Sequence, residues 1–472
     1  MSAAVAAAPP AATARRASGA LARVPVVGWT AVLALVLRVA YGRPAPGYDA
    51  WWSLAWGRQL AHGAVPDLTA PVAPTPHPLA IAVASPLSLL GDAAPAALAL
   101  LGLVAFAAVG VTAAVLGARL FGPVAGALAA AILLTRPLLV GEALECSVDV
   151  PFLALVLGAG AAVARRRHGR ALALLAVAGL LRPEAWPLAL ALGAYARDRR
   201  LVALALAAPV LWLLADLAAT GDPLHSLHGT RALAGDLGRS RSFGAALRLA
   251  PDALTAVLGD GVALLGGAAA IAAVWLVPRR AALPLAILGA GLAGFLVLGL
   301  ADLPLLYRYT ILPAAALALL AAWAPTACTV HRVLAPASIA AAAVLLATTP
   351  TALRAAHRHA TATRAIRGEQ RDLTDLLVAP RTAGALRACP GPPLLAQQRP
   401  VPQVAYLLGR SPAAIRVGGA APATGVILSP EPGSLTFADR LASGDRPAPE
   451  PGATRGARLL DARGAWTALA RC

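Results

Sequence analysis

Residues 47–58 read GYDAWWSLAWGR and directly follow the first strongly apolar segment of the chain. This stretch holds the first acidic residue, Asp49, which has two interpretations. As a helix cap, its side chain would accept hydrogen bonds from the free amides of a first helical turn. As a functional group, it would act as a base at the edge of a membrane. If the stretch is helical, one face carries three large apolar side chains that we expect in the lipid interface, Trp52, Trp56 and Leu60.

The composition is that of a membrane protein. Of 472 residues, 59% are hydrophobic and 13% are charged, whereas a soluble domain has about a quarter charged residues. The net charge is +18, and every basic residue is Arg. These Arg residues separate apolar runs instead of forming a basic soluble surface, which argues against a nucleic-acid partner. We therefore expect a polytopic membrane protein that contacts membrane lipids.

About eleven apolar runs are long enough to cross a bilayer. They lie at roughly 24–40, 93–118, 122–140, 149–164, 170–182, 184–196, 200–218, 256–277, 281–300, 304–324 and 333–349. The two runs that meet at Arg182 are short and could instead form a re-entrant hairpin or a kinked helix. A further apolar segment, 79–90, contains Pro86 and is expected at the interface.

Clusters of Arg residues fall in alternate turns between these runs, on one side of the membrane if eleven spans are counted. The positive-inside rule therefore predicts a cytoplasmic N-terminus, with residues 1–23 as a disordered tail. Residues 24–350 would form the transmembrane domain. The remaining residues, 351–472, would lie outside the cell membrane.

Hydrophobicity falls after residue 350, and short apolar segments separated by Pro and Gly predict a small extracytoplasmic α/β domain over 351–472. Cys389 and Cys472 bracket most of it, and an oxidising compartment favours a disulfide between them. The alternative is two unrelated thiols. None of the four cysteines has the spacing of a metal site, so we expect no metal and no cofactor.

The expected outer turns contain Arg residues that the positive-inside rule does not explain. They are Arg43, Arg58, Arg136, Arg182, Arg231, Arg239, Arg241, Arg248 and Arg308. A guanidinium matches the geometry of phosphate oxygens, so as a set they predict an anionic partner such as a lipid phosphate. For any single Arg, snorkelling or pairing with a nearby acid is the alternative.

Acidic residues form a second group on the same side. Glu142, Glu145 and Asp149 are spaced by three and four residues, which places them on one face if that turn is helical. They could bind a sugar or a metal, or pair with Arg residues, and pairing is our interpretation of Glu145. Glu184 belongs to the same outer group. His77, His225 and His228 are expected to be solvent-exposed loop residues, because two His ligands without a third make a weak metal site.

These features resemble the GT-C glycosyltransferases. The resemblance rests on an Asp shortly after the first span, interfacial helices in that loop, and a second outer turn that reads GEALE at 141–145. Many further spans and a soluble outer tail also fit. The motifs LRPEAW at 181–186 and YRY at 307–309 are similar to segments of protein mannosyltransferase-like and lipopolysaccharide-modifying enzymes of actinobacterial membranes. Unlike several relatives, this chain has Ala50, not a second acid, after Asp49.

The resemblance implies an all-α polytopic bundle that transfers a sugar from a polyprenyl-phosphate donor to a hydroxyl of a lipid or envelope glycan on the outer face, with inversion. It assigns the general base to Asp49. Cations would stabilise the leaving lipid phosphate, and the candidates are Arg182, Arg231 and Arg308. Glu142 and Asp149 would orient the sugar or acceptor, and Arg58 and Glu184 complete the expected substrate-binding set.

Two other classes of protein fit part of the sequence. One is a non-catalytic scaffold of envelope assembly, whose outer domain binds cell-wall material and in which Asp49 is dispensable. The other is a lipid or sugar transporter. Transporters often show internal repeats and polar groups at the bilayer midplane, whereas here the halves show no repeat and the polar groups gather at one face.

Overall fold

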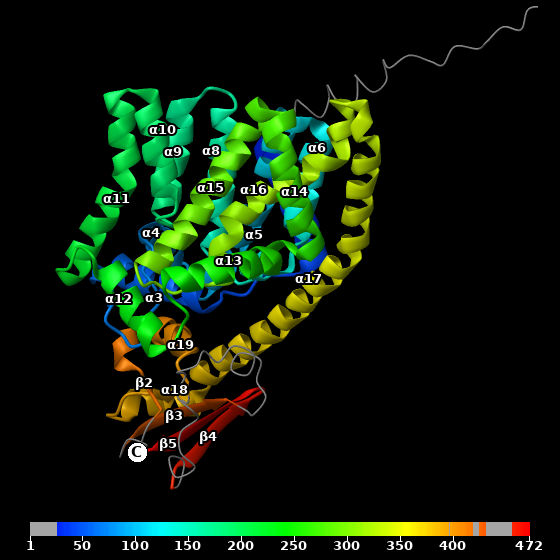
Figure 1. The fold of residues 1–472 in the computed structure, drawn as a ribbon. Coiled ribbons are helices and arrows are strands. Elements are labelled where there is room, and N and C mark those ends of the chain that lie inside the picture. The colour runs from blue at the N-terminus through cyan, green and yellow to red at the C-terminus, as the bar shows by residue number, and fades with distance from the viewer. Residues whose placement is uncertain (1–25, 396, 419–423, 431–455) are drawn as a thin grey trace, which may run out of the picture.

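The computed structural model describes residues 26–395, 397–418, 424–430 and 456–472. The expected N-terminal tail, residues 1–23, lies outside these ranges. A helical bundle forms one end of the molecule, and a small domain with a sheet forms the other (Figure 1).

The bundle contains the helices that the apolar runs predict and one more, α13 (Phe243–Leu258), which no apolar run predicts. The others are α2 (Val26–Tyr41), α5 (Ala94–Phe121), α6 (Pro123–Thr135), α7 (Pro137–Leu144), α8 (Asp149–Val163), α9 (His168–Gly179), α10 (Ala185–Ala196), α11 (Arg199–Thr220), α14 (Asp260–Leu276), α15 (Pro278–Leu300), α16 (Ile311–Trp323) and α17 (Ala335–Val378). Within the described residues, five helical segments are long and apolar enough to cross a membrane, or up to seven if each of two bent pairs is one span. Four shorter apolar helices accompany them. The chain is a multi-pass membrane protein.

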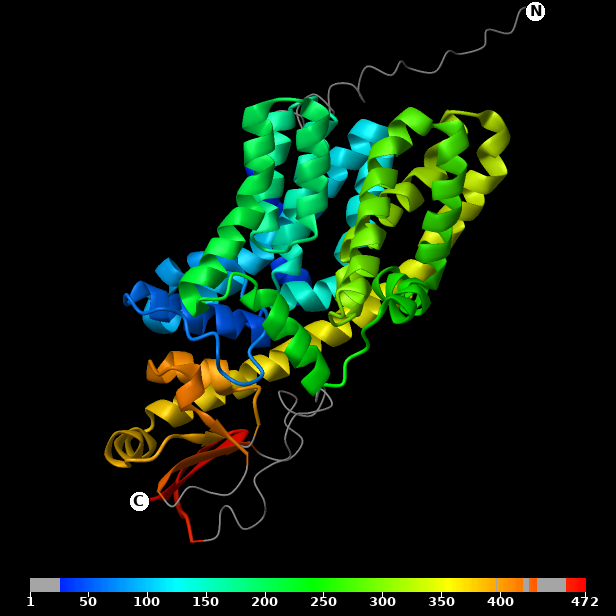
Figure 2. The same cartoon turned by 60° about the vertical axis from the view of Figure 1, so that its left-hand side comes forward.

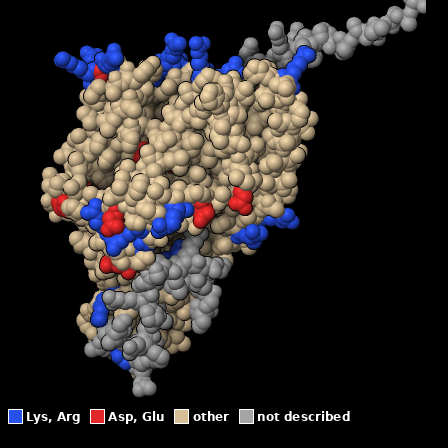
Figure 3. All heavy atoms as spheres, in the orientation of Figure 1, with Lys and Arg blue, Asp and Glu red and all other residues tan. Residues whose placement is uncertain are grey.

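The surface has the charge distribution that a bilayer requires. Figure 3 shows a broad band with almost no charged atoms, bounded at one end by Arg side chains and at the other by a belt of mixed charge. The small C-terminal domain lies beyond that belt (Figure 1). The apolar band matches a part of the molecule that lies in lipid.

Close packing in the bundle depends on small residues. A Cβ atom on Gly117 of α5 would lie 2.9 Å from the Cα of Gly126 in α6, so only glycine lets these backbones approach. A Cβ atom on Gly266 of α14 would likewise lie 2.8 Å from the Leu317 carbonyl oxygen of α16. Helix α16 lies at the centre of the bundle, and all 13 of its residues are buried.

Short helices cover the end of the bundle that faces the C-terminal domain: α3 (Tyr48–Ala61), α4 (Pro78–Ser88) and α12 (His225–Asp236) (Figure 1). The prediction that Trp52 and Trp56 of α3 lie in the lipid interface is wrong. They are 0% and 1% exposed and pack in one core with Leu376 and Trp466 of the C-terminal part. Leu60 is 45% exposed. A protein domain thus covers the face that a hydropathy argument assigns to lipid.

Helix α17 joins the two ends of the molecule. Its 44 residues span about 66 Å at 1.5 Å per residue, more than twice the hydrocarbon thickness. Its first part packs on the bundle, and its second part leaves the bundle and packs on the sheet (Figure 2). The expected domain boundary at residue 350 lies at Pro350, inside this continuous helix.

The C-terminal part is an α/β domain, as the sequence predicts. It contains β1 (Leu394–Leu395), β2 (Arg416–Val417), β3 (Gly425–Pro430), β4 (Arg458–Arg463), β5 (Trp466–Arg471), α18 (Pro380–Ala388) and α19 (Val401–Leu408). The strand order is β2-β1-β3-β5-β4, with β1 parallel to both neighbours and β5 antiparallel to both of its own.

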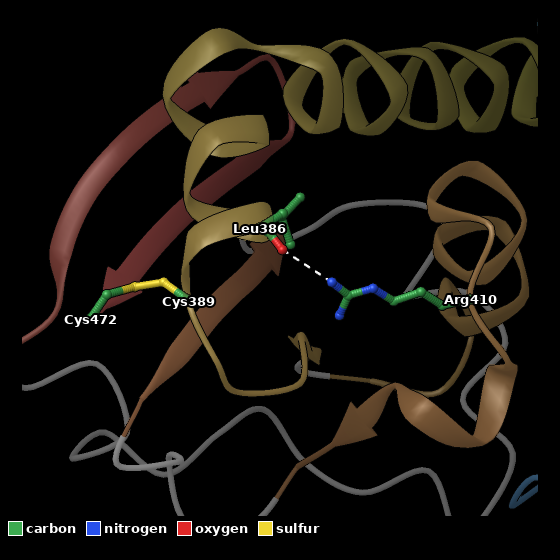
Figure 4. Close-up of a disulfide and its surroundings, with 4 residues drawn as sticks. All are labelled: Leu386, Cys389, Arg410 and Cys472. Atoms are coloured by element: carbon green, nitrogen blue, oxygen red, sulfur yellow. Dashed lines mark hydrogen bonds between the residues drawn. A yellow bond between two sulfur atoms is a disulfide. The ribbon is translucent and has the colours of Figure 1, made fainter.

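A disulfide joins Cys389, which follows α18, to Cys472, which follows β5, and the two Cα atoms lie 5.6 Å apart (Figure 4). Nearby, Arg410 Nη2 donates a 3.0 Å hydrogen bond to the Leu386 carbonyl oxygen. These two links connect α18 to the last strand and to the segment after α19.

Candidate active site

Asp49 lies in the first turn of α3, but it does not cap the helix. The N-cap is Gly47, and no side chain caps this end. The Asp49 carboxylate instead accepts a 2.9 Å hydrogen bond from Nη2 of Arg308. Arg308 belongs to the short 3-10 helix η2 (Tyr307–Thr310), which directly precedes α16. The cap interpretation is therefore wrong, and Asp49 is half of an ion pair between two distant parts of the chain.

Arg308 contacts three carboxylates. Besides Asp49, its Nη1 lies 3.7 Å from Glu142 Oε2 and its Nε lies 3.8 Å from Asp149 Oδ2. Burial by itself would lower the pKa of the guanidinium, but Asp49 and Glu142 outweigh this effect and raise it. Arg308 thus stays charged between the acids that the sequence groups together.

Glu142 and Asp149 do not share a helical face, because the helix is broken between them. Helix α7 ends at Leu144, Cys146 has a φ of +60°, and α8 begins at Asp149. The turn nevertheless brings both acids within 4 Å of Arg308. The sequence spacing predicts the correct neighbours for the wrong geometric reason.

A second Arg lies behind Arg308. Arg182 forms ion pairs with Asp149 and Glu184 and lies over the Tyr309 ring at 4.4 Å. Asp149 also accepts a 2.8 Å hydrogen bond from the Ser147 hydroxyl. Arg182 and Asp149 are only 6% and 2% exposed. Acids and arginines are therefore connected in one set, the ion-pair network, which comprises Asp49, Arg308, Glu142, Asp149, Arg182 and Glu184.

His77 is not a solvent-exposed loop residue. It is partly buried before α4, its ring meets Trp212 edge-on at 5.9 Å, and Nδ1 is buried with no hydrogen-bond partner in the described part of the chain. Burial and then the charge of Arg182 lower its pKa to about 4. The ring is therefore neutral at pH 7, beside the ion-pair network.

The carboxylate of Asp49 is ionised at neutral pH. Burial would raise its pKa, but Arg308 and then His77 counter this effect and hold the pKa below its usual value. The side chain remains 22% exposed. An ionised carboxylate with an open side can accept a proton from a substrate.

Asp49 opens into a cavity of about 390 Å³. The cavity is lined by Gly47, Tyr48, Asp49, Ala50, Leu138, Glu142, Glu145, Ser147, Arg239, Leu306, Tyr307, Arg308 and Arg399. Its wall is therefore formed by the ends of α3 and α7, by η2, and by segments that follow α12 and β1. A volume of this size holds a small organic group such as a sugar ring.

Two further arginines line the cavity, Arg239 and Arg399. Across the ranges that the structure describes, neither guanidinium has an ion-pair or hydrogen-bond partner. Arg239 belongs to the set of unexplained outer arginines, although the sequence does not distinguish it from the others. Arg399 gives no sequence signal, because it lies in the C-terminal part, 350 residues after Asp49.

Other expected substrate-binding residues lie elsewhere. Arg58 donates to the Tyr406 carbonyl oxygen and lies 5.4 Å from its ring centroid, so it connects α3 to α19. Arg231 donates to the Ala301 carbonyl oxygen at the end of α15, at 2.8 Å from Nη2. Both guanidinium groups bind backbone carbonyls at the C-terminal ends of helices.

Arg182, Asp149 and Glu184 support the cavity wall from behind and do not line the cavity. Within the described ranges, no group of three or more His, Cys, Asp or Glu side chains could hold a metal ion. Arg308 supplies the positive charge among these carboxylates.

No protein-family model matches this sequence, and no curated protein matches it. Solved structures do share its fold. ArnT from Cupriavidus metallidurans, bound to undecaprenyl phosphate, aligns with a TM-score of 0.51 and 15% identity over 97% of this chain and 98% of that chain.

An oligosaccharyltransferase from Archaeoglobus fulgidus, in complex with zinc and sulfate, aligns with a TM-score of 0.52 and 13% identity over 86% of this chain and 68% of that chain. The archaeal oligosaccharyltransferase AglB from the same organism, in complex with an inhibitory peptide and a dolichol-phosphate, gives 0.51 and 11% over 86% and 69%. At this identity the likeness concerns the fold, which is that of GT-C membrane glycosyltransferases.

Proposed function

We propose that this protein is a membrane glycosyltransferase that moves a sugar from a polyprenyl-phosphate donor to a hydroxyl acceptor on the outer face of the membrane. One observation carries the proposal. A carboxylate held ionised by Arg308 opens into a 390 Å³ cavity whose wall also presents two guanidinium groups that have no ion-pair or hydrogen-bond partner among the described residues. The GT-C fold and the lipid phosphates bound by ArnT and AglB support it.

In the proposed reaction, the acceptor hydroxyl attacks the anomeric carbon of the sugar. Asp49 takes the proton of that hydroxyl as general base. The bond between the anomeric carbon and the lipid phosphate oxygen breaks on the opposite side, so the configuration inverts. The neighbouring Arg308 keeps Asp49 deprotonated before the attack.

The departing lipid phosphate needs positive charge that the protein has not already used. Arg182 is enclosed by Asp149 and Glu184, and Arg231 is bonded to a backbone carbonyl. We therefore assign the phosphate to Arg239 and Arg399, with Arg308 beside them on the cavity wall. Glu142 lines the same wall and is positioned to accept a hydrogen bond from a sugar or acceptor hydroxyl.

The scaffold alternative makes the opposite prediction for Asp49. A scaffold would use the outer domain alone, and the Asp49 carboxylate would have no role in its activity. Transport remains the less favoured alternative, because the residues of the ion-pair network lie near helix ends, such as the starts of α3 and α8, and not in the middle of long helices. We place the cavity and the C-terminal domain outside, on the basis of the positive-inside rule.

The test is transfer of radiolabel by purified full-length protein from a panel of polyprenyl-phosphate sugars to acceptors in a membrane extract. Asp49→Asn removes the base and should lower transfer at least a hundredfold. The matched control is Asp252→Asn, which changes an exposed acid on α13 in the same way. Transfer by wild type and by the control but not by Asp49→Asn supports the proposal.

Equal transfer by Asp49→Asn would refute the role of Asp49. No transfer by folded wild type across the panel would favour the scaffold. A second pair of variants tests the phosphate assignment. Arg239→Gln should raise the donor concentration at half-maximal rate, and Arg248→Gln, on the exposed side of α13, should leave it unchanged.

A further inference from the structure

A second concentration of positive charge lies at the opposite end of the bundle from the C-terminal domain. The turn between α8 and α9 contains Arg165, Arg166 and Arg167, and Arg170 follows in the first turn of α9. Arg119 lies in the last turn of α5. All five side chains belong to exposed residues.

These guanidinium groups repel one another. The pKa of Arg165 is lowered by partial burial and then by the charges of Arg119, Arg167 and Arg170. In the part of the chain that the structure describes, no carboxylate forms an ion pair with any of them. A cluster of like positive charges without a counterion favours the binding of an anion.

A pocket of about 130 Å³ opens beside this cluster. Three of its lining residues are Arg165, Arg167 and Arg170, and the others are Val26, Val111, Thr112, Val115, Gly158, Ala161 and Ala162. The apolar part thus comes from three helices, α2, α5 and α8. The Thr112 hydroxyl is already bonded to the Ala108 carbonyl, so the helix walls offer little beyond apolar contact.

The pocket has a positively charged end and an apolar end, which matches the charged headgroup and apolar chain of a lipid. Three arginines stand at the end of the bundle, and valine and alanine side chains continue from them into the membrane-spanning part. Its volume equals about four water molecules in the liquid. That is enough for a phosphate group or the first atoms of an acyl chain, with the rest of the lipid outside between the helices.

We propose that this pocket binds one anionic phospholipid, in the leaflet opposite the C-terminal domain. Arg165, Arg167 and Arg170 hold the phosphate, and the first part of an acyl chain lies along Val111 and Val115. Basic pockets between membrane helices are a recognised way of binding acidic lipid headgroups. This site is far from the cavity of Asp49 and does not depend on the proposed glycosyl transfer.

A general preference of arginines for one side of the membrane would explain the charge but not the pocket. Arg279, Arg280 and Arg332 offer a matched comparison. They are exposed at the same end of the bundle, in the first turn of α15 and just before α17, and they line neither the 390 Å³ cavity nor the 130 Å³ pocket. If only charge mattered, both sets of three would bind acidic lipid equally.

The experiment is native mass spectrometry of the full-length protein, released from detergent in the presence of phosphatidylglycerol, phosphatidylcholine or inorganic phosphate. Wild type should retain one phosphatidylglycerol in preference to phosphatidylcholine. Replacing Arg165, Arg167 and Arg170 together by Gln should weaken that binding about a hundredfold, since each such charge contributes about a factor of five to the affinity. Replacing Arg279, Arg280 and Arg332 by Gln should leave it unchanged.

A pocket-narrowing variant tests the apolar part. A Cβ atom on Gly158 would meet Thr112 and Leu174 at 3.6 Å, an ordinary contact, so Gly158→Ala should narrow the pocket without disturbing the fold. It should lower lipid retention while all arginines remain. Equal loss in both arginine variants, equal retention of phosphatidylcholine, or displacement of the lipid by millimolar inorganic phosphate would each overturn the proposal.

Discussion

Arg308→Gln should destabilise the fold in a way that depends on pH. Arg308 holds Asp49 at 2.9 Å, Glu142 at 3.7 Å and Asp149 at 3.8 Å. At an effective dielectric constant of about 20, two unit charges 4 Å apart attract by about 4 kcal/mol. Desolvation and the partial exposure of both side chains, 29% and 22%, offset part of this attraction. We expect a loss of about 3 kcal/mol, the lower end for breaking a buried ion pair.

The pH dependence identifies the cause. The pKa of Asp49 in the folded protein is below its unfolded value of about 4. The stabilisation from Arg308 is therefore fully present above pH 4 and is lost as the pH falls through the folded pKa. The difference in free energy of unfolding between wild type and Arg308→Gln should be largest at pH 7 and should shrink below pH 4.

Titration with sodium dodecyl sulfate in mixed micelles would measure this difference at pH 7 and pH 3.5. Arg308→Lys is the control for charge without the planar fork, because an ammonium group cannot reach three carboxylates at once. It should lose about half as much stability. The reasoning is refuted if Arg308→Gln is as stable as wild type at pH 7, or if its deficit is the same at both pH values.

Three other measurements test separate parts of the structure. Replacing Cys389 and Cys472 by Ser opens a loop of 83 residues and should cost the C-terminal domain about 4 kcal/mol, seen as faster limited proteolysis of that domain. Gly117→Leu forces α5 from α6 and should cost about 2 to 3 kcal/mol of unfolding free energy, whereas Gly267→Leu, with no described atom within 4 Å of the new Cβ, should cost little. The pKa of His77 is lowered to about 4, so protonation favours the unfolded state, and wild type should lose about 3 kcal/mol relative to His77→Gln as the pH falls from 7 to 4.

The membrane fold can be predicted from the sequence, because a segment that crosses a bilayer must be an apolar run of sufficient length. Each apolar run of the expected length contains a helix in the structure, including the short pair α9 and α10 on either side of Arg182. What hydropathy does not report is where a helix leaves the membrane. Helix α17 continues through Pro350 into the C-terminal domain, since a helix needs no change in backbone hydrogen bonding where lipid gives way to water.

The site is harder to predict from the sequence than the membrane fold, because the residues that pair in it are far apart along the chain. Asp49 and Arg308 pair across 259 residues. Charge alone groups them on the same side of the membrane, but it does not distinguish Arg308, which contacts Asp49, from Arg231, which contacts a helix carbonyl. Arg399 could not be found, because its importance comes only from the return of the C-terminal part to the membrane surface.

The packing of the C-terminal domain against the membrane part also decides how the enzyme and scaffold hypotheses can be separated. Gln370 Nε2 donates a 2.8 Å hydrogen bond to the Pro46 carbonyl, and Trp52 is buried in a core shared with the C-terminal domain. Deleting the domain would therefore expose α3 and remove Arg399 from the cavity, so loss of function after deletion is expected under both hypotheses. A single change at Asp49 leaves the packing between the two parts intact. Only such a change tests whether the carboxylate, and not the domain beside it, carries the activity.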